Sequence, residues 1–153
     1  MKLFELTKFL INLKSPTGEE QEISQFLFDY IQKMGFTVEL QEVTPGRFNV
    51  YAYHGKPKVV LSTHLDTVYP VLPMSEDEDY IYGRGACDAK GILAAQIKAG
   101  EALIKEGIKR FGLLFVVGEE GGSDGAVKAN QIENSCSYLI NGEPTNSKMG
   151  LGS

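Results

Sequence analysis

One histidine and five carboxylic acids stand out in this sequence, because each lies just after an apolar segment or just before a helix-like one. They are His64, Asp66, Asp88, Glu119, Glu120 and Glu143. Carboxylates held close together raise one another's pKa, so a site built from them needs a cation to compensate their charge. One imidazole with several carboxylates suits zinc, and would also accept cobalt or manganese. These residues predict a site for divalent metal ions, provided that the fold brings them together.

The spacing within this set indicates a different task for each member. His64 and Asp66 are two residues apart, so in extended backbone their side chains point the same way. Asp66 could then accept the second imidazole N–H and fix the metal-binding tautomer of His64. Glu119 and Glu120 are adjacent, so one can ligate a metal while the other reaches a water as general base. Two metals that share a carboxylate would lower the pKa of that water from about 15.7 to about 7.

The elements that must position these residues alternate between strands and helices. We expect strands at residues 59–61, 113–117 and 138–140, and helices at about 90–106 and 124–131. The strands are short apolar runs, which are typical of central strands covered on both faces. Gly107 would end the first helix and Asp124 would be the N-cap of the second. The alternation predicts an α/β sheet with helices on both faces, whose ligands bind beyond the carboxyl ends of the strands.

The first third of the chain adds two helices and two strands. Apolar residues at helical spacing predict helices around 6–13 and 23–34, and strands are expected at 37–43 and 48–53. Thr17 followed by Glu20 indicates a capping box before the second helix, and Gly35 indicates its end. Pro45 and Gly46 indicate a turn between the two strands.

Composition restricts the class of protein. The chain has 153 residues, of which 42% are apolar, so it is one globular domain or part of a larger one. A net charge of −5 without a basic tract argues against nucleic acid as a partner, and no apolar run approaches the ~18 residues of a membrane span. Phosphate-binding, dinucleotide-binding and serine-nucleophile glycine motifs are absent from the sequence. Cys87 and Cys136 form no disulfide framework, so we expect a cytoplasmic protein.

Each motif also has an ordinary structural interpretation. A lone histidine after a strand is commonly structural, Asp88 could cap the helix that follows it, and Glu143 could be a turn residue. The glutamates of residues 118–122 could simply form a polar loop. Their joint placement at successive strand ends favours the metal site over these separate interpretations. His54, in an expected hairpin turn, is not expected to be a ligand, and Cys87 is expected to pack or to lie just behind the metal ligands.

Five stretches resemble the co-catalytic zinc metallopeptidases and deacylases of the aminoacylase, acetylornithine deacetylase, succinyl-diaminopimelate desuccinylase and glutamate carboxypeptidase family. They are SPTGEE at 15–20, STHLDTV at 62–68, GRGACDAKG at 83–91, GEEGG at 118–122 and NGEPT at 141–145. They follow the order and approximate spacing of the family over nearly the whole chain. The resemblance implies a zinc-exopeptidase-like sheet. It also implies hydrolysis of an amide bond in an N-acyl amino acid, such as acetylornithine, or in a small peptide.

The resemblance also implies a role for each site residue. Two zinc ions would be held by His64, Asp88, Glu120 and Glu143. Asp88 would bridge the two ions, with His64 and Glu143 on one ion and Glu120 on the other. Glu119 would be the general base and then the proton donor to the leaving amine, and Asp66 would orient or polarise His64. The family further implies a cis peptide bond after Asp88.

This sequence differs from the family in length. Family members are much longer: their second zinc takes a late histidine, and a lid domain supplies dimer and substrate contacts. We therefore expect residues 1–153 to be a truncated, N-terminal portion of the catalytic domain, without the lid and the C-terminal part. The parent would be a homodimer through that lid, and uncovered sheet edges predict self-association of this chain. The alternative is a fragment or module that binds metal or a partner without catalysis.

Overall fold

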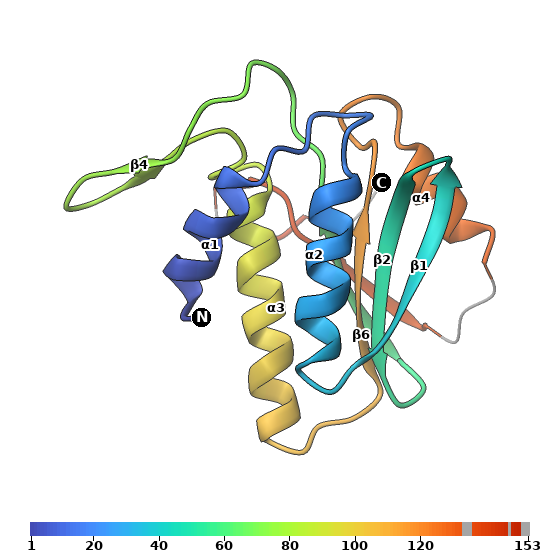
Figure 1. Cartoon of the computed structure of the whole chain (residues 1–153). Helices are drawn as coiled ribbons and strands as arrows, with labels where there is room; N and C mark the ends of the chain where they lie inside the picture. The colour runs from blue at the N-terminus through green and yellow to red at the C-terminus, as the bar shows by residue number, and fades with distance from the viewer. Residues whose placement is uncertain (133–135, 147, 151–153) are drawn as a thin grey trace.

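A five-stranded mixed sheet forms the centre of the structure, a computed structural model that describes residues 1–132, 136–146 and 148–150 (Figure 1). The strands are β1 (Thr37–Thr44), β2 (Arg47–His54), β3 (Val59–His64), β6 (Phe111–Val116) and β7 (Tyr138–Asn141). Their order is β1-β2-β6-β3-β7. β2 is antiparallel to both β1 and β6, whereas β6, β3 and β7 run parallel. The carboxyl ends of these last three strands therefore meet at one edge of the sheet.

Three helices cover one face of the sheet and a short helix lies on the other, as the sequence predicts (Figure 1). The three are α1 (Leu3–Asn12), α2 (Gln21–Gln32) and α3 (Lys90–Lys105), and the short one is α4 (Asp124–Asn130). A two-stranded ribbon of β4 (Ser75–Glu76) and β5 (Ile81–Tyr82) projects away from the sheet. Among the described residues, no helix combines the length and the apolar character needed to cross a bilayer.

The core lies between the sheet and the three helices. Ile23, Leu27 and Ile31 recur every four residues along α2, so they form one buried stripe. Leu113 and Phe115 alternate along β6 and face the same core. This packing fixes β3 and β6 in a parallel register that places His64 beside Val116. The two loops that follow these strands therefore start next to each other.

The opposite face is partly open. A hollow of about 620 Å³ is lined by residues of the sheet, α4 and the site edge. β7 is an edge strand, and Tyr138, Leu139 and Ile140 are 55–62% exposed. The prediction that 138–140 is covered on both faces is therefore wrong for this structure, because an apolar run does not specify which elements pack against it.

Three local predictions are wrong in detail. Thr17 does not cap α2, which begins at Gln21 without a side-chain cap. The N-cap of α4 is Ser123, and Asp124 is the first helical residue. His54 lies at the end of β2 beside Phe111 of β6, rather than in a hairpin turn. In each case a contact between residues far apart in the sequence determines the local structure. Spacing in the sequence does not reveal such a contact.

Candidate metal centre

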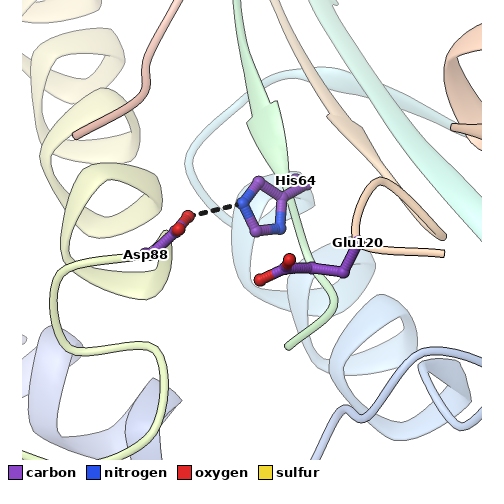
Figure 2. A group of neighbouring side chains, drawn as sticks. All are labelled: His64, Asp88 and Glu120. Atoms are coloured by element: carbon purple, nitrogen blue, oxygen red, sulfur yellow. Dashed lines mark hydrogen bonds and ion pairs between the residues drawn. The ribbon is translucent and has the colours of Figure 1, made fainter. Parts of the chain in front are cut away.

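His64, Asp88 and Glu120 come together at the carboxyl edge of the parallel strands (Figure 2). His64 ends β3, Asp88 precedes α3, and Glu120 lies in the loop after β6. One donor atom from each side chain lies within 4.8 Å of the others. The Nε2 atom of His64 is 2.8 Å from Oδ1 of Asp88. The fold therefore brings together three of the four metal ligands that the sequence predicts.

The fourth predicted ligand lies beside this cluster. Oε2 of Glu143 is 3.8 Å from Nε2 of His64, although Glu143 follows the exposed strand β7. The amide of Asn141 donates a hydrogen bond of 3.2 Å to the other oxygen of Glu143. The peptide bond after Asp88 is cis, as the resemblance implies.

The imidazole of His64 is held from both sides. Its Nδ1 lies 2.9 Å from the backbone oxygen of Asp66, and 3.5 Å from the Oδ1 atom of that residue. Nδ1–H therefore donates mainly to the carbonyl oxygen, and Nε2 faces the acidic cluster. Asp66 therefore contacts His64 with both its backbone and its side chain, and the backbone makes the shorter contact.

The carboxylate of Asp66 has a different main task in this structure. It accepts the backbone N–H of Glu119 at 3.0 Å and that of Glu120 at 3.1 Å. The hydroxyl of Thr17 donates to the same carboxylate at 2.7 Å. These bonds could not be predicted from the sequence, because nothing in local spacing links Thr17 or residue 119 to Asp66.

The electrostatics of the site reflect crowded negative charge. Burial lowers the pKa of His64, but hydrogen bonds to Asp66 and Asp88 outweigh it and raise that pKa to about 9. Burial and neighbouring carboxylates raise the pKa of Glu120 and of Glu143. Burial also opposes ionisation of Asp66, yet its hydrogen bonds hold its pKa below the ordinary value. These shifts show that the acidic groups of the cluster act strongly on one another and on His64.

Contacts outside the metal cluster also determine the shape of the loop that carries the two glutamates. Arg47 donates to both oxygens of the buried Glu20, at 2.7 and 2.8 Å, and to Asp124 at 2.6 Å. A β-carbon on Gly118 would lie 1.8 Å from Oδ1 of Asp124 and 2.6 Å from Nη2 of Arg47. Gly118 has a φ of +70°, so only glycine fits at this position without strain. A lone arginine next to a turn gave no signal of this role in the sequence.

The donor set of the cluster fits a divalent metal ion. It combines an imidazole nitrogen, whose other nitrogen already has an acceptor, with carboxylates that face it. Nitrogen and carboxylate oxygen are common zinc ligands. Unlike an ordinary ion pair, the cluster holds more acidic groups than one imidazolium can neutralise.

A family model described as peptidase family M20/M25/M40 matches residues 60–152, which include the whole cluster. The chain belongs to peptidase family M20/M25/M40. A peptidase M20 domain-containing protein of Schizosaccharomyces pombe is 46% identical over 98% of the chain and 40% of that protein. A probable carboxypeptidase of Aspergillus clavatus is 39% identical over 94% of the chain and 39% of that protein. The chain thus spans about two fifths of the length of these curated M20 relatives.

Solved structures of the M20 family share the fold. A tripeptidase from Staphylococcus aureus superposes with a TM-score of 0.77 at 27% identity, over 92% of this chain and 43% of the other. A Bacillus subtilis protein, described as a dinuclear metal binding peptidase from the M20 family, gives a TM-score of 0.65 at 17% identity. That match covers 92% of this chain and 41% of the other. The expected α/β zinc-exopeptidase-like architecture is confirmed, and the family is one of hydrolytic peptidases.

Proposed function

We propose that the protein hydrolyses an amide bond of a short peptide in a metal-dependent reaction, with Glu119 as general base. One observation carries the proposal: His64, Asp88 and Glu120 converge, with Glu143 adjacent, at the edge where a sheet of this type binds ligands. Membership of a peptidase family supports the reaction class. The resemblance of the five sequence stretches supports the role of each residue.

Four side chains would hold the metal. His64, Asp88 and Glu143 would bind one zinc ion, and Asp88 with Glu120 would bind a second, with cobalt or manganese as substitutes. When bound, these ions would polarise the substrate carbonyl and lower the pKa of the attacking water. The 2.9 Å bond from Nδ1 of His64 to the carbonyl of Asp66 supports this assignment, because it leaves Nε2 for a ligand bond.

Glu119 would move the proton. Its backbone N–H is fixed by Asp66, and its side chain lines the same hollow as His64 and Glu143. The Glu119 carboxylate would accept a proton from the attacking water and then give it to the leaving amine. Asp66 would support this step indirectly, since it holds the imidazole of His64 and the backbone of Glu119.

The substrate class has two candidates. The relatives named as carboxypeptidase and tripeptidase support a peptide. An N-acyl amino acid such as acetylornithine is the second candidate, which the sequence resemblance favours. Homodimerisation of the parent through a lid domain stays a prediction.

A non-catalytic role of the 153-residue chain by itself is the other function to consider. In the part of the chain that the structure describes, the acidic cluster contains one histidine, and His54 packs near Phe36 and Phe111 instead. The predicted second zinc takes a further histidine in the family. This observation favours metal binding without turnover for the chain alone, and activity for the full-length protein.

The decisive experiment replaces Glu119 by alanine in the full-length protein. We expect kcat for the best substrate to fall by roughly 10²–10⁴-fold, while elemental mass spectrometry finds the same metal content. The substrate is chosen from a panel of dipeptides, tripeptides and N-acetyl amino acids that includes acetylornithine. Glu78→Ala, at an exposed site in the projecting ribbon, is the matched control and leaves kcat unchanged. Near-normal activity of Glu119→Ala would reject the assigned role.

A further inference from the structure

We propose that Thr17 is a positioning residue that sets the direction of Glu119 and Glu120 through the carboxylate of Asp66. The proposal deepens the proposed function and rests on it, since that function gives the two glutamates their tasks. Thr17 lies 49 residues before Asp66 in the sequence, and its hydroxyl donates a hydrogen bond to the Asp66 carboxylate.

The hydrogen bonds at Asp66 carry the argument. Oδ2 of Asp66 accepts both the Thr17 hydroxyl, at 2.7 Å, and the N–H of Glu120, at 3.1 Å. Oδ1 accepts the N–H of Glu119 at 3.0 Å. Rotation of this carboxylate about its Cβ–Cγ bond would break both backbone bonds together. The Thr17 hydroxyl opposes that rotation, so it stabilises the loop orientation from a distance.

The backbone around Thr17 is itself fixed, which gives its hydroxyl a defined position. Pro16 and Thr67 form a parallel bridge. The N–H of Thr17 donates to the oxygen of Thr67 at 3.2 Å, and the N–H of Thr67 donates to Ser15 at 2.9 Å. The Ser15 hydroxyl donates to Leu65 at 2.8 Å. Residues 15–17 therefore run alongside the segment that carries Asp66, as a short extension beyond β3.

The methyl group of Thr17 makes a second contact with the same loop. A β-carbon added to Gly121 would lie 2.7 Å from Cγ2 of Thr17, so the loop backbone passes close to this methyl. The methyl of Thr17 thus packs beside the loop, whereas the hydroxyl sets the direction of the loop through Asp66. Helix capping does not account for the hydroxyl, because α2 has no side-chain cap.

Three substitutions separate these contributions. Thr17→Val keeps the shape and removes the hydroxyl, whereas Thr17→Ser keeps the hydroxyl and removes the methyl. Thr17→Ala is a second hydroxyl-free variant, to be compared with Thr17→Ser if the valine variant folds poorly. Thr7→Val is the matched control, because the Thr7 hydroxyl donates to Leu3 within α1, away from the site.

The first measurement is amide hydrogen exchange of Glu119 and Glu120 by NMR on the 153-residue chain. We expect exchange about 10-fold faster in Thr17→Val, because a hydrogen bond to a charged group is lost from the group that holds both amides. Thr17→Ser and Thr7→Val should exchange like the wild-type chain. Unchanged exchange in Thr17→Val would overturn the proposal, as would equal acceleration in Thr17→Val and Thr17→Ser.

The second set of measurements uses the full-length protein. Calorimetry gives its zinc affinity, and a hydrolysis assay gives its kcat and KM. In Thr17→Val we expect zinc affinity and kcat to fall by about 10-fold each, with KM changed much less, and Thr17→Ser to restore both. A fall in KM and kcat together, or none in zinc affinity, would overturn the positioning role. If the full-length protein hydrolyses no amide but the exchange pattern is as expected, the proposed function fails and the positioning of the loop by Thr17 stands.

Discussion

The candidate metal centre has a buried half and an exposed half, and they are built differently. The buried half is His64 and Asp66, whose side chains are 1% and 0% exposed, with the backbone of residues 119–120 bound to them. The exposed half is Asp88 and Glu143, whose side chains are 50% and 34% exposed. Strand pairing and buried hydrogen bonds hold the first half in place. The second half is open to solvent, so fewer contacts with the rest of the protein hold its side chains.

The largest difference in the free energy of unfolding is expected when side chains are shortened in the strands that support the two halves. Leu113 on β6 is fully buried, whereas Leu139 on β7 is 59% exposed. We expect Leu113→Ala to lower the free energy of unfolding by about 2–5 kcal/mol, through the cavity that it leaves. Leu139→Ala should change it by less than about 0.5 kcal/mol. Urea unfolding followed by circular dichroism measures both, and equal losses would remove the distinction between the two halves.

Ligand removal should separate the halves by a smaller margin. His64→Ala removes the buried nitrogen donor, and we expect zinc affinity to fall by at least about 100-fold. Glu143→Ala removes a carboxylate that solvent and neighbouring acids can partly replace, so about 10-fold is expected. Calorimetric titration with zinc chloride gives both values, with Glu78→Ala as the control. A larger loss for Glu143→Ala would mean that the exposed half dominates binding.

The smallest effect is a pH dependence of the metal-free chain. The folded pKa of His64 is about 9, above its ordinary value of 6.5, so protonated His64 stabilises the fold fully below about pH 6.5. This stabilisation is lost as pH rises through about 9. Zinc affinity should rise over the same interval, because the imidazole must lose its proton to bind the ion.

Unfolding measured from pH 6 to 10, with and without His64→Ala, checks this prediction. The variant should lose the downward slope of stability in this range. At acidic pH, Asp66 should give the free energy of unfolding the opposite trend. The pKa of Asp66 is lowered in the folded state, so its stabilising contribution disappears as pH falls. If the free energy of unfolding of the wild-type chain does not change between pH 6.5 and 9, the strong coupling of His64 to its acidic neighbours is contradicted.

The sequence indicates the side chains of the candidate metal centre better than the groups that hold them in place. His64 ends β3 and Glu120 lies just after β6, so the rule for strand ends placed them correctly at one edge. The prediction for Asp66 was incomplete, because its carboxylate binds two backbone N–H groups that any residue type would offer. A sequence does not show where backbone N–H groups point, because their direction depends on the fold of the loop.

The two wrong predictions of helix caps share a cause. Thr17 and Asp124 have the residue types of helix caps, yet Thr17 bonds Asp66 and Asp124 pairs with Arg47. Capping rules compare residues a few positions apart, whereas these partners are 49 and 77 positions away. Tertiary contacts therefore decide the use of a polar side chain whenever a buried charge lies within reach.

The register that places His64 beside Val116 ties ion binding to folding itself. The cluster exists only when β3 and β6 are paired, so an ion that needs both His64 and Glu120 binds the native chain and not the unfolded one. By mass action, free zinc at about 100 times its dissociation constant would add about 2.7 kcal/mol to the free energy of unfolding. A chelator would remove this increment, so the melting temperature of the chain becomes a gauge of the zinc concentration around it.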